Sequence, residues 1–226
     1  MLDRDVFSGL IRYKFINKKI KDIIVKNPKY AYYYAEFNRK RWPEAEPTII
    51  DGKDINIAFS YFKYVMKGNW PEFTQKIHTD PKYAYYYAMK VILHRWPEGE
   101  PVIMKDPEWA YNYALNIIRG SWPEAEPYIA TDPKWAFFYT QRILKGKRWP
   151  EAEPYIIKSP EWASKYASFV LKNRLPEAEP YIMKDPEWAY AYVLNVIKHR
   201  WPEAEPYIRQ SKKWWDLYKY FVGIRE

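Results

Sequence analysis

Paired glutamates are the first residues in this 226-residue chain whose type and spacing could perform chemistry. Two carboxylates separated by one residue could act as general acid and base or hold a divalent cation. A pair present in nearly every repeat of the chain is better explained by a structural task that all repeats share. Most pairs follow an arginine by three residues, so we predict an inter-repeat ladder of Arg–Glu ion pairs. The pairs are Glu98/Glu100, Glu124/Glu126, Glu151/Glu153, Glu177/Glu179 and Glu203/Glu205, and the arginines are Arg95, Arg148, Arg174 and Arg200.

Other catalytic residue types are sparse. The three histidines, His78, His94 and His199, lie in different repeats, and the chain has no cysteine. The sequence contains no His-x-x-x-His motif, no Gly-rich phosphate loop and no serine elbow. We therefore predict a protein that is not an enzyme and that has no catalytic residue, no metal site and no cofactor.

The repeat itself is the dominant feature of the sequence. Trp-Pro occurs at 42–43, 70–71, 96–97, 122–123, 149–150 and 201–202, and Leu175-Pro176 fills the one gap. The spacing is therefore 26 to 28 residues. Each repeat reads approximately Asp-Pro-x-Trp-Ala-Tyr-x-Tyr-Ala-x-x-Val-Ile-x-x-Arg, followed by Trp-Pro-Glu-Ala-Glu-Pro-Tyr-Ile. A fixed period of this length is typical of solenoid proteins.

The first half of each repeat predicts a helix. An aspartate such as Asp106 can cap the first turn, and the proline after it suits the first helical position. With the aspartate counted as position 1, apolar residues at positions 4, 5, 6, 8, 9, 12, 13 and 16 cover about 200° of the helix. Positions 7, 10, 11 and 14 are expected to face outward. An apolar arc this wide predicts neighbouring helices on both sides.

The second half of each repeat predicts only a short helix, because its second proline excludes a long one. Its tyrosine and isoleucine, such as Tyr128 and Ile129, are expected to fill the inner side of that helix. We predict an all-α fold, a right-handed α-solenoid of about eight long-helix/short-helix repeats of about 26 residues. One domain would span 1–226, with an N-terminal cap over 1–26, repeats over 27–210 and a C-terminal capping helix over 211–226.

The repeat resembles the tyrosine-rich, WPEAEPYI-type helical repeats of bacteriophage proteins, and it is loosely similar to the leucine-rich-repeat-variant class of short solenoids. The resemblance covers about residues 27–210. It implies a phage origin and a helical superhelix, and it carries over no catalytic residue and no ligand. Because small accessory phage proteins often act on host systems, it also implies a host partner, such as a protein of antiviral defence.

Two partner classes remain open, of which a protein is our leading hypothesis. Apolar groups at outward positions indicate an interaction surface. The repeat between Ser159 and Arg174 breaks the pattern of the others, which is explained equally by a contact site there and by relaxed packing. A protein partner would contact Tyr86, Met89, Asn112, Leu115, Phe138, Gln141, Lys165 and Phe169.

The alternative is a nucleic-acid or nucleotide ligand. Cations recur at position 14, where they could follow a phosphate backbone, and exposed aromatics could stack on bases. The other explanation for these cations is that they complement the negative end of each helix. The nucleic-acid-binding residues would be Lys67, Arg119, Arg142, Lys145, Lys172 and Lys198.

Composition and charge limit the class of protein. Aromatic residues make up 20% of the chain, which contains 19 prolines and only 7 glycines, and the formal net charge is +9. The positive charge favours an acidic partner. No stretch reaches the 18 apolar residues of a membrane span, and the N-terminal residues lack the apolar core of a signal peptide. We expect a cytoplasmic protein, in the host cell if viral, that has no membrane partner; the sequence does not indicate its oligomeric state.

Overall fold

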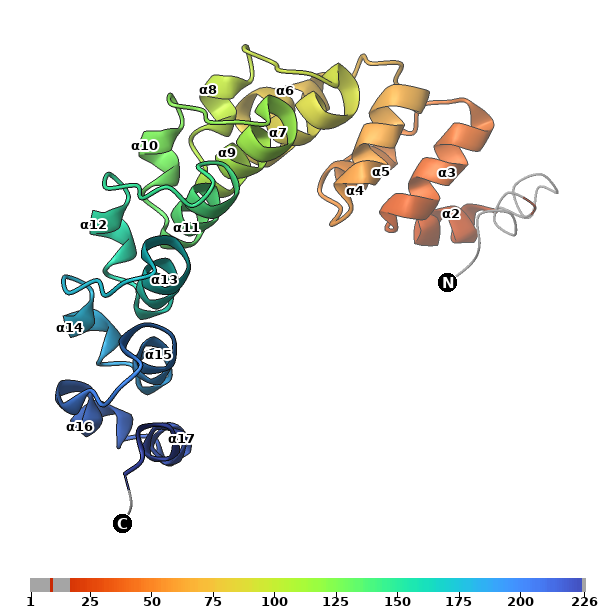
Figure 1. Cartoon of the computed structure of the whole chain (residues 1–226). Coiled ribbons are helices and arrows are strands. Elements are labelled where there is room, and N and C mark those ends of the chain that lie inside the picture. The colour runs from red at the N-terminus through yellow and green to blue at the C-terminus, as the bar shows by residue number, and fades with distance from the viewer. Residues whose placement is uncertain (1–8, 10–16, 225–226) are drawn as a thin grey trace. The chain divides into compact units, whose positions relative to one another are not determined.

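A computed structural model describes residue 9 and residues 17–224, and within them it contains helices and no β-strand. The described chain divides into two compact units, one ending at Tyr87 and the other beginning at Ala88. Figure 1 shows the helices of each unit. The predicted N-terminal cap falls largely outside the described residues, and the prediction of one domain stays a prediction.

The N-terminal unit is built from short helices, and its copies of the repeat are less regular than those of the C-terminal unit. A short 3₁₀ turn, Pro43–Ala45, precedes α4, and a π-helical turn, Tyr61–Val65, extends α5. Its helices are α2 (Lys18–Ile24), α3 (Pro28–Asn38), α4 (Glu46–Ile50), α5 (Ile55–Ser60), α6 (Pro71–Thr79) and α7 (Pro81–Tyr87).

The C-terminal unit alternates long and short helices, with the long ones along one side of the unit and the short ones along the other (Figure 1). The long helices are α9 (Pro107–Tyr113), α11 (Pro133–Arg142), α13 (Pro160–Tyr166), α15 (Pro186–Tyr192) and α17 (Lys212–Val222). The short helices are α8 (Glu100–Ile103), α10 (Glu126–Ile129), α12 (Glu153–Ile156), α14 (Glu179–Ile182) and α16 (Glu205–Ile208). The predicted all-α, solenoid-like alternation is confirmed, while the handedness of a superhelix stays a prediction.

The long helices begin where their capping residues predict. The side chain of Asp106 accepts hydrogen bonds from the backbone N–H groups of Glu108 and Trp109, and Asp132 and Asp185 do the same in α11 and α15. These bonds satisfy donors that have no partner within the helix, and Pro107 occupies a position where its missing N–H has no consequence.

The long helices end in a way that the sequence did not predict. Ala114–Ile118, Ala167–Leu171 and Val193–Ile197 form π-helical turns that continue α9, α13 and α15. The next residue is left-handed and is not glycine, as in Arg119 at φ 60° and Lys172 at φ 52°. A π turn advances each residue by a smaller angle than an α-helix does. The inward and outward faces predicted for positions 10 to 16 therefore shift, and Ser121 at position 16 is exposed instead of buried.

The core is built from alanines and large aromatics. Ala110 and Ala114 are fully buried, which lets neighbouring backbones approach closely, and Tyr113 and Trp122 fill the space between them. One expectation for the short helices is wrong. Tyr128, Tyr155 and Tyr181 are more than 40% exposed, and only the isoleucine after each of them is buried. The short helix has room for one inward side chain per turn, and isoleucine takes it.

No helix among the described residues has the length and apolar character required to cross a bilayer.

Candidate functional site

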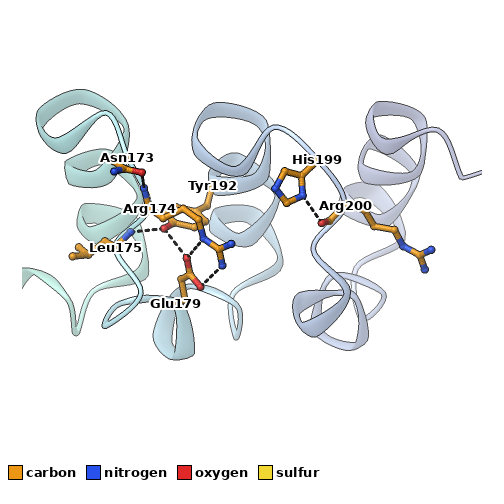
Figure 2. Close-up of polar contacts among 7 residues, drawn as sticks. All are labelled: Asn173, Arg174, Leu175, Glu179, Tyr192, His199 and Arg200. Atoms are coloured by element: carbon orange, nitrogen blue, oxygen red, sulfur yellow. Dashed lines mark hydrogen bonds and ion pairs between the residues drawn. The ribbon is translucent and has the colours of Figure 1, made fainter.

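An arginine, a glutamate and a tyrosine meet at most of the Trp-Pro-Glu-Ala-Glu-Pro segments, here called junctions. At the junction before α14, Nε and Nη2 of Arg174 donate to the two carboxylate oxygens of Glu179 at 2.8 and 2.7 Å (Figure 2). The hydroxyl of Tyr192, from α15, donates to Oε1 of Glu179 at 3.0 Å and accepts the backbone N–H of Leu175 at 2.7 Å. We call this three-residue arrangement a clamp.

The clamp occurs five times among the described residues. The arginine–carboxylate distances lie between 2.6 and 3.0 Å in every copy, which is the bidentate geometry of a guanidinium on a carboxylate. The clamps are Arg41/Glu46/Tyr61, Arg95/Glu100/Tyr113, Arg148/Glu153/Tyr166, Arg174/Glu179/Tyr192 and Arg200/Glu205/Tyr218.

The predicted inter-repeat Arg–Glu ladder is therefore wrong for the hydrogen-bonded ion pairs, while a weaker charge interaction does link repeats: besides Glu100, Glu124 in the next junction raises the pKa of Arg95. Each arginine pairs with the second glutamate of its own junction, five residues later, and the tyrosine hydroxyl makes the link to the following long helix. The first glutamate of each pair, such as Glu98 or Glu124, is exposed. The sequence alone did not distinguish the two glutamates, because both lie within reach of an arginine.

Electrostatics in the clamp favour a fixed ion pair over proton transfer. The guanidinium of Arg148 is the largest influence that lowers the pKa of Glu153, and Arg200 does the same to Glu205. Burial raises the pKa of the tyrosines, to about 12 for Tyr166 and Tyr218. A carboxylate held ionised by a bidentate arginine and a tyrosine held neutral are poor proton carriers at neutral pH.

The structure does not bring the three histidines together into a catalytic cluster. Nδ1 of His199 lies 2.9 Å from the carbonyl oxygen of Arg200 (Figure 2), and His94 makes the same contact with Arg95 at 2.8 Å. Because a carbonyl only accepts, this geometry requires the proton on Nδ1. The described residues contain no group of three or more His, Asp or Glu side chains placed to hold a metal ion.

The eight residues predicted for protein contact are mostly less exposed than expected. Of these eight, only Phe169 is in the exposed class, with 59% of its surface accessible. Phe138 is half-buried in an aromatic cluster with Tyr111, Trp135 and Trp162, so position 7 faces a neighbouring helix and not solvent. Tyr86, Met89, Asn112, Leu115, Gln141 and Lys165 are also half-buried.

The deviation at Ser164 and Lys165 has a structural explanation. Ser164 replaces an aromatic residue on α13, and the ammonium of Lys165 lies over the rings of Trp162 and Trp188 at 4.2 and 5.1 Å. Lys165 also forms an ion pair with Glu161. The lysine side chain thus fills space between two layers of helices. This packing explains why the repeat has Ser164 and Lys165 at these positions, and no binding partner is needed to explain them.

The six residues predicted for nucleic-acid contact are all exposed. Five of them, all except Arg142, are the left-handed residues that follow the long helices, at φ between 52 and 61°. None of the six forms an ion pair with a described carboxylate within 4 Å. The left-handed region costs a residue with a side chain roughly 1–2 kcal/mol. Among the described non-glycine residues that adopt it, all except Leu93 are Lys or Arg, which is informative.

Residues from both predicted sets meet in one groove of about 600 Å³ between the C-terminal ends of two neighbouring long helices. Arg142, Lys145 and Lys172 supply three cations, and Phe169 supplies an exposed ring. We call this surface the cationic groove; its lining is Gln141, Arg142, Lys145, Gly146, Phe169, Val170 and Lys172. The groove can bind an anionic group and pack an apolar group beside it.

Sequence reasoning missed two features of these surfaces. The left-handed ends were not predicted, although cations at position 14 directly before a Gly, as in Lys145-Gly146, were a usable signal. The tyrosine of the clamp was assigned to core packing alone, because its hydroxyl partners lie 13 and 17 residues away.

Comparison of the chain with models of protein families, with curated proteins and with solved structures found no match. The resemblance to bacteriophage repeat proteins therefore stays a prediction.

Proposed function

We propose that this chain is a non-enzymatic binding scaffold that holds an acidic, apolar-containing segment of a protein partner in the cationic groove. The observation that carries the proposal is the position of Phe169, 59% exposed, beside Arg142, Lys145 and Lys172 in that groove. A large, mostly exposed ring beside cations that form no ion pair with a described carboxylate is typical of an interaction site, because both groups remain accessible to a partner.

The carboxylate chemistry of the chain supports a scaffold and not an enzyme. In five clamps the second glutamate is already occupied by arginine and tyrosine. The repeated helices then provide a stable frame whose outward residues vary between copies. That the partner is a host protein, such as one of antiviral defence, is the further implication of the phage resemblance.

A nucleic acid is the second candidate, favoured by the recurrence of left-handed cations at Arg119, Lys145, Lys172 and Lys198 in the C-terminal unit. A single strand could follow such cations and stack a base on Phe169. This candidate predicts a steep salt dependence, because each neutralised phosphate releases a counterion.

The two candidates are separated by measuring binding of a fluorescent acidic peptide that contains leucine and tyrosine, and of a single-stranded oligonucleotide, at low and high salt. We expect the peptide to bind and Phe169→Ala and Arg142→Glu to weaken it. The matched controls are Tyr64→Ala and Lys67→Glu, which alter an exposed aromatic and a left-handed cation in the N-terminal unit.

Equal peptide binding by the groove and control variants would contradict the proposal. Tight oligonucleotide binding that collapses at high salt, with no peptide binding, would replace it with the second candidate. A capture experiment from host lysate with and without nuclease then identifies the natural partner class.

A further inference from the structure

One junction lacks the arginine of its clamp. Ser121 stands where the others place arginine, five residues before the glutamate. Oε1 of Glu126 still accepts the hydroxyl of Tyr139 at 2.8 Å, and the backbone N–H of Trp122 still reaches that hydroxyl at 2.7 Å. Oε2 of Glu126 has no hydrogen-bond donor among the described residues. Two members of the clamp are therefore in place and the third is absent.

A groove of about 620 Å³ opens at this carboxylate, between the junctions before α10 and α12. Its residues match those of a groove in the N-terminal unit, where Pro43, Glu46, Pro47 and Trp70 correspond to Pro123, Glu126, Pro127 and Trp149. In the N-terminal groove, Arg41 lines the wall and binds Glu46. The groove at Glu126 shares these four wall residues and lacks that arginine side chain.

A second carboxylate lines the same groove. Glu151 is the first glutamate of the following junction. In other repeats the equivalent glutamate acts on the arginine of the preceding junction: Glu72 raises the pKa of Arg41, and Glu177 raises that of Arg148. By this correspondence, Glu151 faces the place where an arginine at position 121 would lie. The carboxylates of Glu126 and Glu151 thus lie beside a position that the arginine guanidinium occupies in the five clamps.

The remaining walls also suit a guanidinium carried on a polypeptide. Trp149 and Tyr155 line the groove, and guanidinium groups stack on aromatic faces. Two cations lie nearby. Arg148 is engaged with both oxygens of Glu153, and Lys147 is exposed and makes no ion pair with a described carboxylate. Lys147 thus opposes a cationic ligand without neutralising Glu126.

We propose that the groove at Glu126 binds the guanidinium group of an arginine side chain presented by a polypeptide partner. The bound arginine would complete the sixth clamp, with its fork on the Glu126 carboxylate and Tyr139 fixed on the other side. The volume of the groove exceeds that of one guanidinium and leaves room for the residues that flank it. This site lies apart from the cationic groove, since the two share no lining residue.

The test uses three probes on the full chain: acetyl-Gly-Arg-Gly-amide, the same peptide with lysine, and butylguanidine, a free guanidinium of the same single charge. Binding is followed through the indole N–H resonance of Trp149 in NMR titrations. We expect the arginine peptide to bind about tenfold more tightly than the lysine peptide, because only a guanidinium matches the two oxygens. It should also bind more tightly than butylguanidine, which has the same charge but lacks flanking residues.

Variants make the assignment specific. Ser121→Arg fills the site from within the chain, and Glu126→Gln removes its charge while keeping an acceptor for Tyr139, so each should lower affinity for the arginine peptide about tenfold or more. Ser121→Ala leaves the site open and should bind as the unaltered chain does. Lys147→Gln should bind more tightly. A dispersed NMR spectrum and an undiminished melting temperature verify that Ser121→Arg is folded.

Three results would overturn the proposal: equal affinity for the arginine and lysine peptides, unchanged affinity in Ser121→Arg, or no response of Trp149 to the arginine peptide. Tighter binding of butylguanidine than of the peptide would overturn the polypeptide as the source of the guanidinium. None of these results depends on the cationic groove, so the two proposals can fail separately.

Discussion

The hydroxyl of Tyr113 lies 3.1 Å from Oε1 of Glu100, a carboxylate 13 residues earlier in the chain. It also lies 2.6 Å from the backbone nitrogen of Trp96, whose N–H it accepts. A single hydroxyl therefore joins a junction, a short helix and the following long helix. Because Tyr113 is fully buried, water cannot replace these bonds if the hydroxyl is removed.

Tyr113→Phe should lower the free energy of unfolding by about 1–3 kcal/mol, because it leaves the buried N–H of Trp96 without a partner and removes a donor from Glu100. Urea unfolding followed by circular dichroism measures the change. Tyr128→Phe is the matched control, since Tyr128 is 43% exposed, and its effect should stay within about 0.5 kcal/mol. Equal effects of the two substitutions would show that the clamp does not stabilise the fold.

Alkaline pH should destabilise the protein through the same tyrosines. Burial raises the pKa of Tyr166 and Tyr218 from 10 to about 12. Below pH 10, the phenols are neutral in both the folded and the unfolded chain. Between pH 10 and 12, the unfolded chain ionises its phenols while the folded chain keeps these two neutral, so the free energy of unfolding falls.

Urea unfolding at steps between pH 8 and pH 12, together with tyrosinate absorbance near 295 nm, tests this pH dependence. Exposed tyrosines should titrate first, and the clamp tyrosines should titrate only as the protein unfolds. Tyr166→Phe should reduce the slope of stability against pH in this range. Titration of all tyrosines near pH 10 without unfolding would contradict the expected role of burial.

The sequence predicted those parts of the fold that local chemistry determines. Asp106 and Pro107 mark a helix start because a cap and a missing N–H act within one turn. The second proline of the junction marks the start of the short helix, since Pro127 lies in the first turn of α10, where its missing N–H has no consequence. The alanines at positions 5 and 9 indicate close packing, and Ala110 and Ala114 are fully buried.

The rest depended on geometry that a regular helical wheel does not represent. The π turn over Ala114–Ile118 rotates the last turn of α9, and the left-handed Arg119 then redirects the chain. Phe138 was expected to face outward, yet the next helix covers it with Trp162. The cationic groove depends on the packing of two helices, α11 and α13 with its π turn, so its residues could be proposed from the sequence but not grouped.

The buried alanines should resist enlargement. Ala189→Leu should lower the free energy of unfolding by about 1–3 kcal/mol, because Ala189 is fully buried where α15 packs against its neighbours. Ala191→Leu is the comparison in the same helix, since Ala191 is only half-buried, and its effect should be smaller than that of Ala189→Leu. Thermal unfolding measures both variants. A tolerated leucine at position 189 would mean that α15 is not tightly packed on this side.

Glycine in place of Lys145 and Lys172 should separate the two explanations of the left-handed cations. These lysines adopt φ of 55 and 52°, which glycine reaches without strain. The substitution relieves that strain, which stabilises the folded chain. It also removes a favourable charge at the helix end and gives the unfolded chain more conformational freedom, and both of these effects lower the stability. We therefore expect the free energy of unfolding to change by less than about 1 kcal/mol per site.

Binding should respond quite differently from stability. If the cations serve the cationic groove, the Lys145→Gly/Lys172→Gly chain keeps its fold but loses affinity for the acidic peptide, by about tenfold for each 1.4 kcal/mol of lost attraction. Lys145→Arg/Lys172→Arg should retain binding, because it preserves both charge and backbone conformation. Unchanged peptide binding with a marked loss of stability would instead assign these residues to the helix ends. A loss of peptide binding without a loss of stability would therefore explain why lysine, and not the unstrained glycine, occupies these left-handed positions: its charge contributes to binding a partner.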